Sequence, residues 1–483
     1  MVGVISYGAY IPLHRISREE FFQAWGGFAI PGEKAVANFD EDSITMAVEA
    51  AIDSMMGANQ EKIDALFFAS TTSPYKEKLG SAIVSTVLDL PPEVRTADFT
   101  GSLRVGTIAL RSTLDAIKAG SARRVLLAVA DTRLGAPAGD FEQTLGDGAA
   151  ALLLGEGDVI AEITDSYSIS DEFSGVWRAD GDTFLRSWED RMVLDEGYSR
   201  ILPQAMSGLM EKCNLTPRDF TKAVYDAPTD VRRHMRVGTQ LGFEPGQVQD
   251  PMFMTVGNTG AALATMMLAA ALEEAKPDDR ILFASYGNGA DAFILEVTKA
   301  IGKLGERRAI RKHLESKRMV KNYQTYLRWR GLLTLEAARR PEQAPTSISG
   351  LWRHRREILA LCGARCTSCG TPQYNNPGSL GHSPARVCVV CQAKDQFELY
   401  RFADKKAEVF TFTQDNLTAH ADPPATVAVV DFEGGGRAEF EMTDRDPAQV
   451  EIGMPVEMTF RKLYHDPARG IHNYYWKTRP IRC

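Results

Sequence analysis

The sequence predicts an α/β fold made of two copies of one unit, followed by a metal-binding motif and a small closed β-barrel. Three observations predict this class. Apolar runs alternate with helix-like segments over residues 1–300, part of that pattern occurs twice, and after residue 396 the runs become short and alternating. The chain has 483 residues, more than one hydrophobic core usually organises, so several domains are expected.

The first 300 residues contain both element types. Apolar residues recur every three or four positions in residues 41–56, 106–120 and 260–276, which predicts helices. The predicted strands are nearly unbroken apolar runs, typical of strands that are buried on both faces. These strands are expected at 62–71, 123–132, 150–157, 222–229, 280–287 and 292–298.

Part of this pattern is repeated. A helix, a turn, a strand, a Gly-Asp-Gly turn and a second strand occupy residues 113–156, and a similar series with Gly-Asn-Gly occupies residues 268–297. A duplicated α/β unit predicts two halves packed about a pseudo-twofold axis. The ligand is then expected at the strand ends, where the two halves meet.

The metal motif consists of Cys366-x-x-Cys369 and, after a gap of 18 residues, Cys388-x-x-Cys391. Two such pairs can place four thiolates tetrahedrally around Zn²⁺, and a closed four-sulfur site has no open position for water, so a structural zinc is expected. A redox dithiol is the weaker alternative, since it needs one pair only. Cys362 is expected to be a small buried residue. The weaker alternative is that it serves as an alternative ligand of the zinc ion.

Charge is distributed unevenly along the chain. Residues 301–365 contain sixteen Lys and Arg against five Asp and Glu, so this basic segment should face the acidic remainder of the protein, a phosphorylated ligand, nucleic acid or solvent. Residues 396–483 contain eleven basic and fourteen acidic side chains, which disfavours nucleic acid as a partner of the barrel. A secretory leader and an apolar run of 18 residues are both lacking, so a cytoplasmic protein without a membrane partner is expected.

Seven stretches stand in a characteristic order: GVISYGAYIPLHRI, ASTTSPY, GSLRVGTIAL, YDAPTD, LGF, VGNTGAA and SYGNGADAF. Together they resemble hydroxymethylglutaryl-CoA synthase in its archaeal form, within the thiolase superfamily. Residues 350–480 resemble the rubredoxin-like zinc-ribbon and OB-fold accessory subunits that accompany thiolase-like enzymes as separate chains. The resemblance implies a duplicated fold of α/β/α/β/α layers that binds an acyl-CoA thioester and makes or breaks an adjacent carbon–carbon bond.

The resemblance also implies a division of the chain into five parts, and a homodimer, with a further enzyme subunit as an additional partner. The parts are a first thiolase-like half at 1–165, a second half at 166–300, a basic helical connector at 301–349, a helix and zinc ribbon at 350–395, and an OB-fold domain at 396–483.

The sequence departs from the family at three catalytic positions. In the synthase, a Cys at a helix N-terminus becomes acylated, a Glu is the general acid/base and a His positions the second substrate. By resemblance, Leu103 stands at the Cys, Thr71 at the Glu and Asp226 at the His. Asn258 and the turn from Tyr286 to Gly289 do match. Cys213 is expected at the end of a helix, far from this elbow, so covalent thioester chemistry of the usual kind is not expected.

The leading hypothesis is a non-covalent aldol or retro-aldol reaction on a 3-hydroxyacyl-CoA. Backbone amides at a helix N-terminus attract negative charge with or without a thiol, so the elbow and Asn258 could hold an enolate while Asp226 takes the β-hydroxyl proton. Three tyrosines are candidate acids or hydrogen-bond donors: Tyr75, Tyr225 and Tyr286. The predicted binding positions for the CoA thioester are Leu103, Gly257, Gly287, Arg353 and Arg356, the two arginines with Arg355 near phosphates or against the acidic part of the protein.

Two other functions remain open. One is acyl transfer with Ser102 as the nucleophile, although a serine without an adjacent base is a poor nucleophile and the nearest histidine in sequence is His234. The other is a non-catalytic CoA-binding or scaffold subunit. Structural roles are also open, with Ser102 as a helix N-cap, Asp226 and Asn258 as turn residues and the tyrosines as core.

Overall fold

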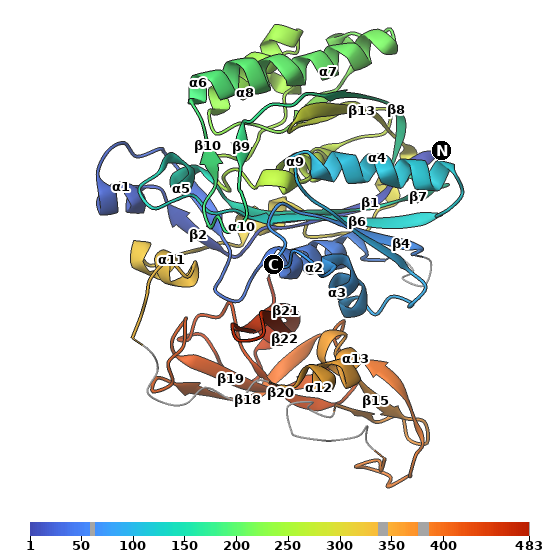
Figure 1. Cartoon of the computed structure of the whole chain (residues 1–483). Coiled ribbons are helices and arrows are strands. Elements are labelled where there is room, and N and C mark those ends of the chain that lie inside the picture. The colour runs from blue at the N-terminus through green and yellow to red at the C-terminus, as the bar shows by residue number, and fades with distance from the viewer. Residues whose placement is uncertain (58–62, 337–345, 375–385, 483) are drawn as a thin grey trace. The chain divides into compact units, whose positions relative to one another are not determined.

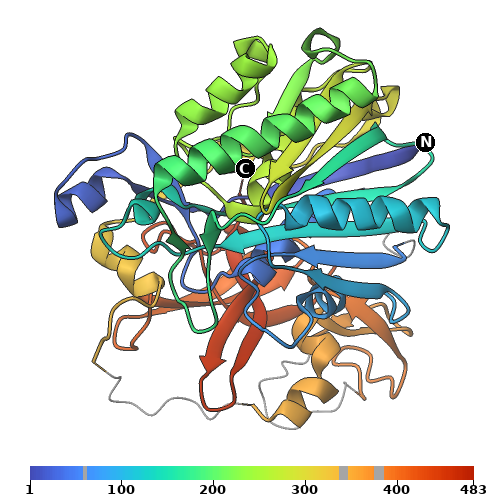
Figure 2. The same cartoon turned by 45° about the horizontal axis from the view of Figure 1, so that its top comes forward.

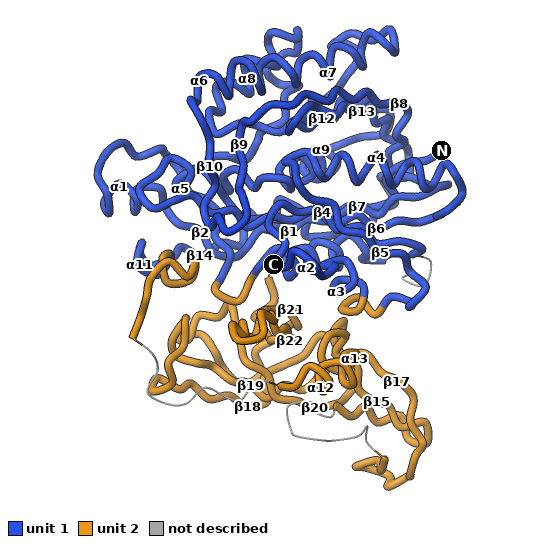
Figure 3. The backbone as a smooth tube through the Cα atoms, viewed as in Figure 1, with its two compact units in different colours: residues 1–38, 42–85, 90–326 blue, residues 39–41, 86–89, 327–483 orange. Residues whose placement is uncertain are grey.

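The structure, a computed structural model, describes residues 1–57, 63–336, 346–374 and 386–482, and the chain forms two compact units (Figure 3). Unit 1 comprises residues 1–38, 42–85 and 90–326, and unit 2 comprises residues 39–41, 86–89 and 327–483. The finer division into five parts remains a prediction.

A nine-stranded sheet forms the frame of unit 1, in the order β11-β12-β13-β8-β1-β7-β6-β4-β5. Four of its strands lie within the predicted runs, and β7 and β13 overlap theirs but begin three residues earlier, so these six strand predictions are confirmed apart from two starts. The strands of the first half are β1 (Val2–Tyr10), β4 (Ala65–Ala69), β5 (Arg95–Phe99), β6 (Arg124–Thr132) and β7 (Asp147–Glu156). Those of the second half are β8 (Ala161–Ser170), β11 (Lys222–Tyr225), β12 (Arg280–Tyr286) and β13 (Gly289–Val297).

The strand order shows the predicted duplication. Reading outward from the middle of the sheet, β1, β7, β6 and β4 of the first half match β8, β13, β12 and β11 of the second. The halves join where β1 pairs with β8 in antiparallel fashion, with Gly3 opposite Glu162. In both halves the outer pairs are parallel, β4 with β6 and β11 with β12, so their carboxyl ends lie on one side.

Two central helices lie between the two halves, and further helices cover the outer face of each half (Figures 1 and 2). The result is five layers of helix, strand, helix, strand and helix. The central helices α4 and α9 pack on strands, while α2 covers the first half and α7 the second. Residues Leu263–Leu272 of α9 are buried without interruption, as expected of a helix covered on all sides. The bounds are α2 (Ser43–Ser54), α3 (Gly80–Val87), α4 (Val105–Lys118), α7 (Ser199–Lys212), α8 (Val231–Leu241) and α9 (Leu263–Glu274). None of the helices in the described ranges combines the length and apolarity needed to cross a bilayer.

The basic segment after residue 300 is only partly helical. It contains η6 (Lys299–Lys303), α10 (Arg311–Glu315), β14 (Arg318–Met319) and α11 (Tyr323–Trp329). Within unit 1, Arg307 is buried and donates to Tyr7 O at 2.7 Å, and Lys317 lies 2.6 Å from Glu33. This part of the segment therefore meets the acidic part of the protein, which was one of the predicted alternatives. Residues 337–345 lie outside the described residues.

Unit 2 contains the predicted small barrel. Its five strands have the order β20-β19-β18-β21-β22, and a parallel bridge between Met442 and Thr478 brings the two edges together. Burial alternates strictly along β19, so one face of that strand forms the barrel core. The strands are β18 (Ala407–Asp415), β19 (Ala425–Phe432), β20 (Arg437–Glu441), β21 (Pro455–Asp466) and β22 (Ile471–Pro480).

The helix expected at the start of residues 350–395 is divided in two. It forms α12 (Ile348–Arg353) and α13 (Arg355–Leu359), separated at His354, whose ψ of 18° is not helical. The chain then enters β15 (Cys362–Cys366), which pairs with β17 (Phe397–Arg401). Pairing with a distant strand thus replaces the last predicted helical turns.

A cluster of buried charges lies inside unit 2. Arg461 contacts three carboxylates, those of Asp40 at 3.2 Å, Glu41 at 2.8 Å and Asp444 at 2.6 Å. Lys477 lies 3.0 Å from Asp40 as well. The side chains of these five residues are at most 2% exposed, so the attraction acts with little solvent screening.

Replacing Arg461 with Met should lower the free energy of unfolding of unit 2 by about 3–5 kcal/mol, because three buried carboxylates lose their main counter-charge. Urea unfolding of the full chain measures this. The matched variant Arg437→Met removes the exposed pair with Asp431 and should leave the unfolding midpoint almost unchanged. Equal unfolding midpoints for the two variants would contradict the prediction that the buried cluster stabilises unit 2.

Candidate functional site

The site in unit 1 forms where strand ends and helix starts come together. Leu103 lies in the turn that leads into α4, and Asn258 lies just before η5 (Gly260–Ala262) and α9. Asp226 directly follows β11, and Tyr286 ends its parallel neighbour β12. The duplicated fold therefore collects polar residues from both halves at the carboxyl ends of the strands, as predicted.

The elbow before α4 is fastened to the turn between β12 and β13. The Ser102 hydroxyl donates to Gly287 O at 2.7 Å, and the Arg104 guanidinium lies 2.9 Å from the Asp291 carboxylate. A Cβ on Gly287 would lie 2.8 Å from the Arg104 nitrogen and 3.0 Å from the Leu103 nitrogen. Position 287 thus excludes any side chain, and the backbone of the turn lies directly against the backbone of the elbow.

Two cavities meet at this elbow. The larger cavity has a volume of about 840 Å³ and includes Asp226 and Asn258 in its lining, whereas the smaller has about 380 Å³ and includes Thr71 and Ser102. Five residues line both cavities: Leu103, Arg133, Gly175, Val176 and Tyr286. Leu103 is therefore part of the boundary between the two cavities.

Asp226 faces the larger cavity with little polar support. Its Oδ1 accepts a hydrogen bond from the Tyr286 amide at 3.0 Å, and no ion pair with Asp226 occurs among the described residues. Burial raises the pKa of Asp226 to about 7, and the bond from the Tyr286 amide lowers it only in part. A carboxyl group with this pKa can accept or release a proton near neutral pH.

Both polar atoms of the Asn258 side-chain amide form hydrogen bonds to the backbone. Nδ2 donates to Ala227 O at 2.9 Å, and Oδ1 accepts from the Gly260 amide at 2.9 Å. The preceding Gly257 has a φ of +87°, which a residue with a side chain adopts only with strain. Since Nδ2 carries two hydrogens, one N–H can still donate into the cavity.

Thr71 is engaged by a buried aspartate. Its hydroxyl donates to Asp131 Oδ2 at 2.8 Å and its amide donates to Oδ1 at 2.7 Å. Asp131 also accepts from Ser70, Thr72 and the Ala261 amide at 2.8–3.0 Å. The Thr71 proton is therefore already used in a hydrogen bond, which makes Thr71 a weak candidate for general acid.

Sequence reasoning missed three residues of this site: Asp131, Arg133 and Tyr198. Arg133 follows β6 directly and is 5% exposed. Tyr198 ends a π-helical segment (Val193–Tyr198), donates from its hydroxyl to Asp226 O at 2.9 Å, and its ring lies 5.8 Å from that of Tyr286. Asp131 and Arg133 could have been found from the sequence, because they are two charged residues at the carboxyl end of a predicted buried strand.

Several candidates line neither cavity. Tyr75 lies under the ammonium group of Lys78, and the Tyr225 hydroxyl donates to His234 O at 2.9 Å. His234 is buried with Nε2 3.0 Å from Gln249 O, and burial lowers its pKa to about 4. Cys213 caps the C-terminus of α7, as expected from the sequence. Tyr225 and His234 thus make structural hydrogen bonds and line neither cavity, so a catalytic role for Tyr225 stays a prediction.

The predicted binding arginines belong to unit 2. Arg353, Arg355 and Arg356 line a separate hollow of about 280 Å³, and Arg356 lies 2.7 Å from the Asp89 carboxylate. Asp89 is itself part of unit 2. The sequence predicted these arginines either near CoA phosphates or against the acidic part of the protein. The contact with Asp89 agrees with the second alternative, and binding of CoA phosphates stays a prediction.

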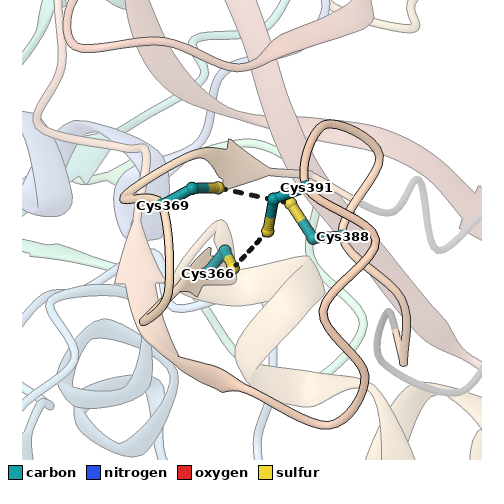
Figure 4. A group of neighbouring side chains, drawn as sticks. All are labelled: Cys366, Cys369, Cys388 and Cys391. Carbon is teal, nitrogen blue, oxygen red and sulfur yellow. Dashed lines mark hydrogen bonds between the residues drawn. The ribbon is translucent and has the colours of Figure 1, made fainter.

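The four predicted cysteine ligands converge in unit 2 (Figure 4). Their sulfur atoms all lie within 4.8 Å of one another, with Cys366 and Cys391 at 3.7 Å and Cys369 and Cys388 at 3.5 Å. Four sulfurs arranged tetrahedrally at Zn–S distances of about 2.3 Å would be about 3.8 Å apart, so the cluster fits such an ion. Cys362 lies apart from the cluster, with its sulfur 3.9 Å from Asp89.

Comparison of the sequence with known proteins identifies relatives of most of the chain. It is 34% identical over 338 residues to hydroxymethylglutaryl-CoA synthase of Methanopyrus kandleri, which covers 67% of this chain and 96% of the relative. It is 33% identical over 351 residues to the hydroxymethylglutaryl-CoA synthase of Caldivirga maquilingensis, which covers 69% of this chain and 99% of the relative. The family model of the ChsH2 C-terminal OB-fold domain matches residues 400–461.

Solved structures share the fold at lower sequence identity. PksG, an HMG-CoA synthase from Bacillus subtilis, aligns with a TM-score of 0.59 at 18% identity and covers 68% of this chain and 89% of that one. A crystal structure of HMG-CoA synthase complexed with CoA aligns with a TM-score of 0.58 at 18% identity and covers 67% and 89%. The predicted thiolase-like fold and OB-fold domain are confirmed.

The gain in melting temperature of Asp226→Asn over the wild type should be larger at about pH 8 than at about pH 5. The folded-state pKa is raised from 3.8 to about 7, so the wild type loses stability as the pH rises between these two values, whereas Asn does not titrate. Thermal unfolding of both proteins at the two pH values measures the difference. A difference in melting temperature that does not change with pH would contradict the raised pKa.

The cysteine cluster should hold one metal ion per chain. Elemental analysis of the purified full chain should give one equivalent, and Cys388→Ser should lower it to well below one, since three thiolates hold a structural ion less well than four. Cys362→Ser, outside the cluster, is the matched control and should retain the metal. Equal metal content in the two variants would argue against the cluster as the binding site.

Proposed function

The chain belongs to the hydroxymethylglutaryl-CoA synthase family, and from this premise we propose that it catalyses an aldol or retro-aldol reaction on a 3-hydroxyacyl-CoA without an acyl-enzyme. The observation that carries the proposal is the composition of the elbow. Leu103 stands before α4, and no cysteine occurs among the described residues that line the two cavities. Cys213 caps α7 and lines neither cavity.

In the cleavage direction, the Asp226 carboxylate takes the proton of the β-hydroxyl group. The electrons of the O–H bond form a carbonyl at the β-carbon, the bond between the α- and β-carbons breaks, and its electron pair becomes the enolate of the thioester. Protonation of that enolate at the α-carbon completes the reaction, so no oxidant or reductant is needed. A pKa of about 7 suits Asp226 to this proton transfer near neutral pH.

Charge that develops on the thioester oxygen needs fixed hydrogen-bond donors. Asn258 retains one N–H at the junction of the halves, and the N-terminus of α4 adds the partial positive charge of a helix start, although the Val105 and Thr107 amides already donate to Ser102 O and Arg104 O. Both groups are in place before the reaction. Tyr286 lines both cavities. Burial, and to a smaller extent the charge of Asp226, raises the pKa of Tyr286 to about 12. Its side chain is therefore a neutral phenol that can donate a hydrogen bond. These groups support enolate stabilisation in the absence of a thiol.

Acyl transfer from Ser102 is less well supported. The Ser102 hydroxyl donates to Gly287 O at 2.7 Å, and no histidine occurs among the described residues that line either cavity. Without a neighbouring base the hydroxyl is a poor nucleophile. A non-catalytic CoA-binding subunit is the remaining alternative, and the experiment below distinguishes it.

The other roles follow from the family and the sequence. We propose that the cysteine cluster holds a structural Zn²⁺, because four thiolates leave no position for a substrate. A homodimer, a further enzyme subunit as partner and a cytoplasmic location remain predictions.

Incubation with a panel of acyl-CoAs in D₂O, followed by mass spectrometry of thioester and protein, tests the proposed function. The wild type should introduce deuterium at the α-carbon without a protein adduct. With 3-hydroxyacyl-CoAs, Asp226→Asn should slow release of the carbonyl fragment by about 10²–10⁴-fold, because the general base is lost. Asp165→Asn, whose residue lines neither cavity, is the control and should keep full activity.

Two outcomes would contradict the aldolase, and a third would contradict only the assignment of its base. An acyl adduct on Ser102 would support the transferase. Full cleavage activity in Asp226→Asn would remove Asp226 as the base. If deuterium, adduct and cleavage were all absent with every acyl-CoA, the non-catalytic subunit would be favoured.

A further inference from the structure

Asp226 stands where the strand ladder no longer holds the chain. The last paired residue of β11 is Tyr225, opposite Ala284 of β12, and Asp226 comes directly after it. Backbone groups beyond the end of a ladder need other hydrogen-bond partners to fix their position. A general base also works only when it lies within hydrogen-bond reach of the proton that it takes. The contacts that fix residue 226 are therefore part of the site.

Side-chain hydrogen bonds hold the segment after β11. The Tyr198 hydroxyl donates to Asp226 O at 2.9 Å, and Nδ2 of Asn258 donates to Ala227 O at 2.9 Å. The Asp226 carboxylate accepts a further bond from the Tyr286 amide at 3.0 Å. Tyr198 and Asn258 thus fix two consecutive carbonyl groups, and the first of them belongs to the proposed base.

Tyr198 reaches this segment because of a local π-helix. The element η2 (Val193–Tyr198) lies between α6 (Asp190–Met192) and α7, and hydrogen bonds of the i→i+5 type place residues five apart on the same side. In an α-helix the same two residues would point about 140° apart. Val193 and Tyr198 both line the larger cavity. The π-helical turn therefore brings the phenol to the site.

The ring of Tyr198 also packs against Tyr286. The two ring centroids are 5.8 Å apart with an interplanar angle of 90°, which is an edge-to-face contact. A Cβ on the neighbouring Gly197 would overlap the Tyr286 hydroxyl oxygen, so position 197 has to be glycine for Tyr286 to lie where it does. Tyr286 in turn supplies the amide that holds the Asp226 carboxylate. The π-helix acts on Asp226 directly through Tyr198 and also through the position of Tyr286.

Tyr198 is a neutral donor at physiological pH. It is 3% exposed, and burial, with a smaller contribution from the charge of Asp226, raises the pKa of Tyr198 well above its ordinary value. Burial also raises the pKa of Tyr225, raises that of Tyr286 to about 12 and lowers that of His234 to about 4. These four neighbours of Asp226 therefore do not titrate between pH 5 and pH 8.

We propose that Tyr198 is a positioning residue for the general base, and that its hydroxyl fixes the backbone of Asp226 so that the carboxylate faces the β-hydroxyl group of the substrate. This inference rests on the proposed function, in which Asp226 takes that proton. Tyr198 itself transfers no proton. Phe at position 198 would keep the ring, its contact with Tyr286 and its place in the cavity lining, and would remove only the hydrogen bond to Asp226 O.

Cleavage kinetics of Tyr198→Phe test this role with the 3-hydroxyacyl-CoA that the wild type cleaves fastest. The value of kcat should fall about tenfold while KM changes less than about twofold, because the bond orients the base and does not hold the thioester. In the Asp226→Asn background the same replacement should change kcat by less than about twofold, since a positioning residue has no effect once the group that it positions is lost. A residue with only a structural role would lower the rate in both backgrounds.

Tyr323→Phe is the matched control. Tyr323 is also buried in unit 1, and its hydroxyl donates to Glu142 at 2.7 Å, but Tyr323 lines neither cavity. This variant should lose at least as much thermal stability as Tyr198→Phe and should keep kcat within about twofold of the wild-type value.

A second measurement does not depend on catalysis. The gain in melting temperature of Asp226→Asn at pH 8 relative to pH 5 reports the burial that raises the pKa of Asp226. Without the Tyr198 hydroxyl the carboxyl group should relax toward solvent, so the pH-dependent part of this gain should shrink to about half or less in the Tyr198→Phe background. The charged residues Asp195 of η2 and Arg233 of α8 form an ion pair with each other and are the same in both backgrounds.

The outcomes separate this inference from the proposed function. Unchanged kcat in Tyr198→Phe, or an equal loss in the wild-type and Asp226→Asn backgrounds, would overturn the positioning role and leave the aldolase in place. If the wild type showed neither cleavage nor deuterium exchange, the aldolase would fail, and the melting experiment would then decide the role of Tyr198. An unchanged pH dependence of the gain would overturn that role, whereas a reduced one would support Tyr198 as the residue that holds Asp226.

Discussion

The contact between the start of α4 and the turn after β12 is the constraint on which the site depends. Gly287 has no room for a Cβ, because the nitrogens of Arg104 and Leu103 would lie within 3.0 Å of it. The buried ion pair between Arg104 and Asp291 joins the same two segments. Because β12 continues into this turn, the contact also sets the position of Tyr286, whose amide holds the Asp226 carboxylate. Elements of both halves are thus fixed to one another around the reacting position.

This arrangement is the basis of the proposal that a thiolase-like site works without a thiol. The elbow still leads into the N-terminus of α4, and what changes is the side chain, since Leu103 lines both cavities. In the proposed function Asp226 transfers the proton, because it is partly buried and its carboxylate accepts a hydrogen bond from the Tyr286 amide. Asp131 accepts five hydrogen bonds and is unsuited to proton transfer. The two carboxylates therefore have different roles in the proposed function because their surroundings differ.

Unit 2 achieves stability by different means. Its sulfur cluster fits a metal ion, and the barrel contains Arg461 and Lys477 surrounded by carboxylates. The acidic composition seen in the sequence is thus partly internal and neutralised by these two cations. A composition count cannot distinguish such buried pairs from a repelling surface, because it ignores where each charge lies.

The sequence by itself determined the features that arise from local patterns. Helix and strand periodicity predicted the duplicated α/β layers and the barrel, spacing predicted the cysteine cluster, and the family motifs placed Leu103, Asp226, Asn258 and Tyr286, all of which line the larger cavity. Tertiary structure alone decided the rest. It turned Tyr225 toward His234, ended the predicted helix at Leu359 by pairing β15 with β17, and brought Arg133 and Arg178 to one cavity. Burial, charge proximity and strand pairing depend on residues far apart in the chain, and no local pattern contains that information.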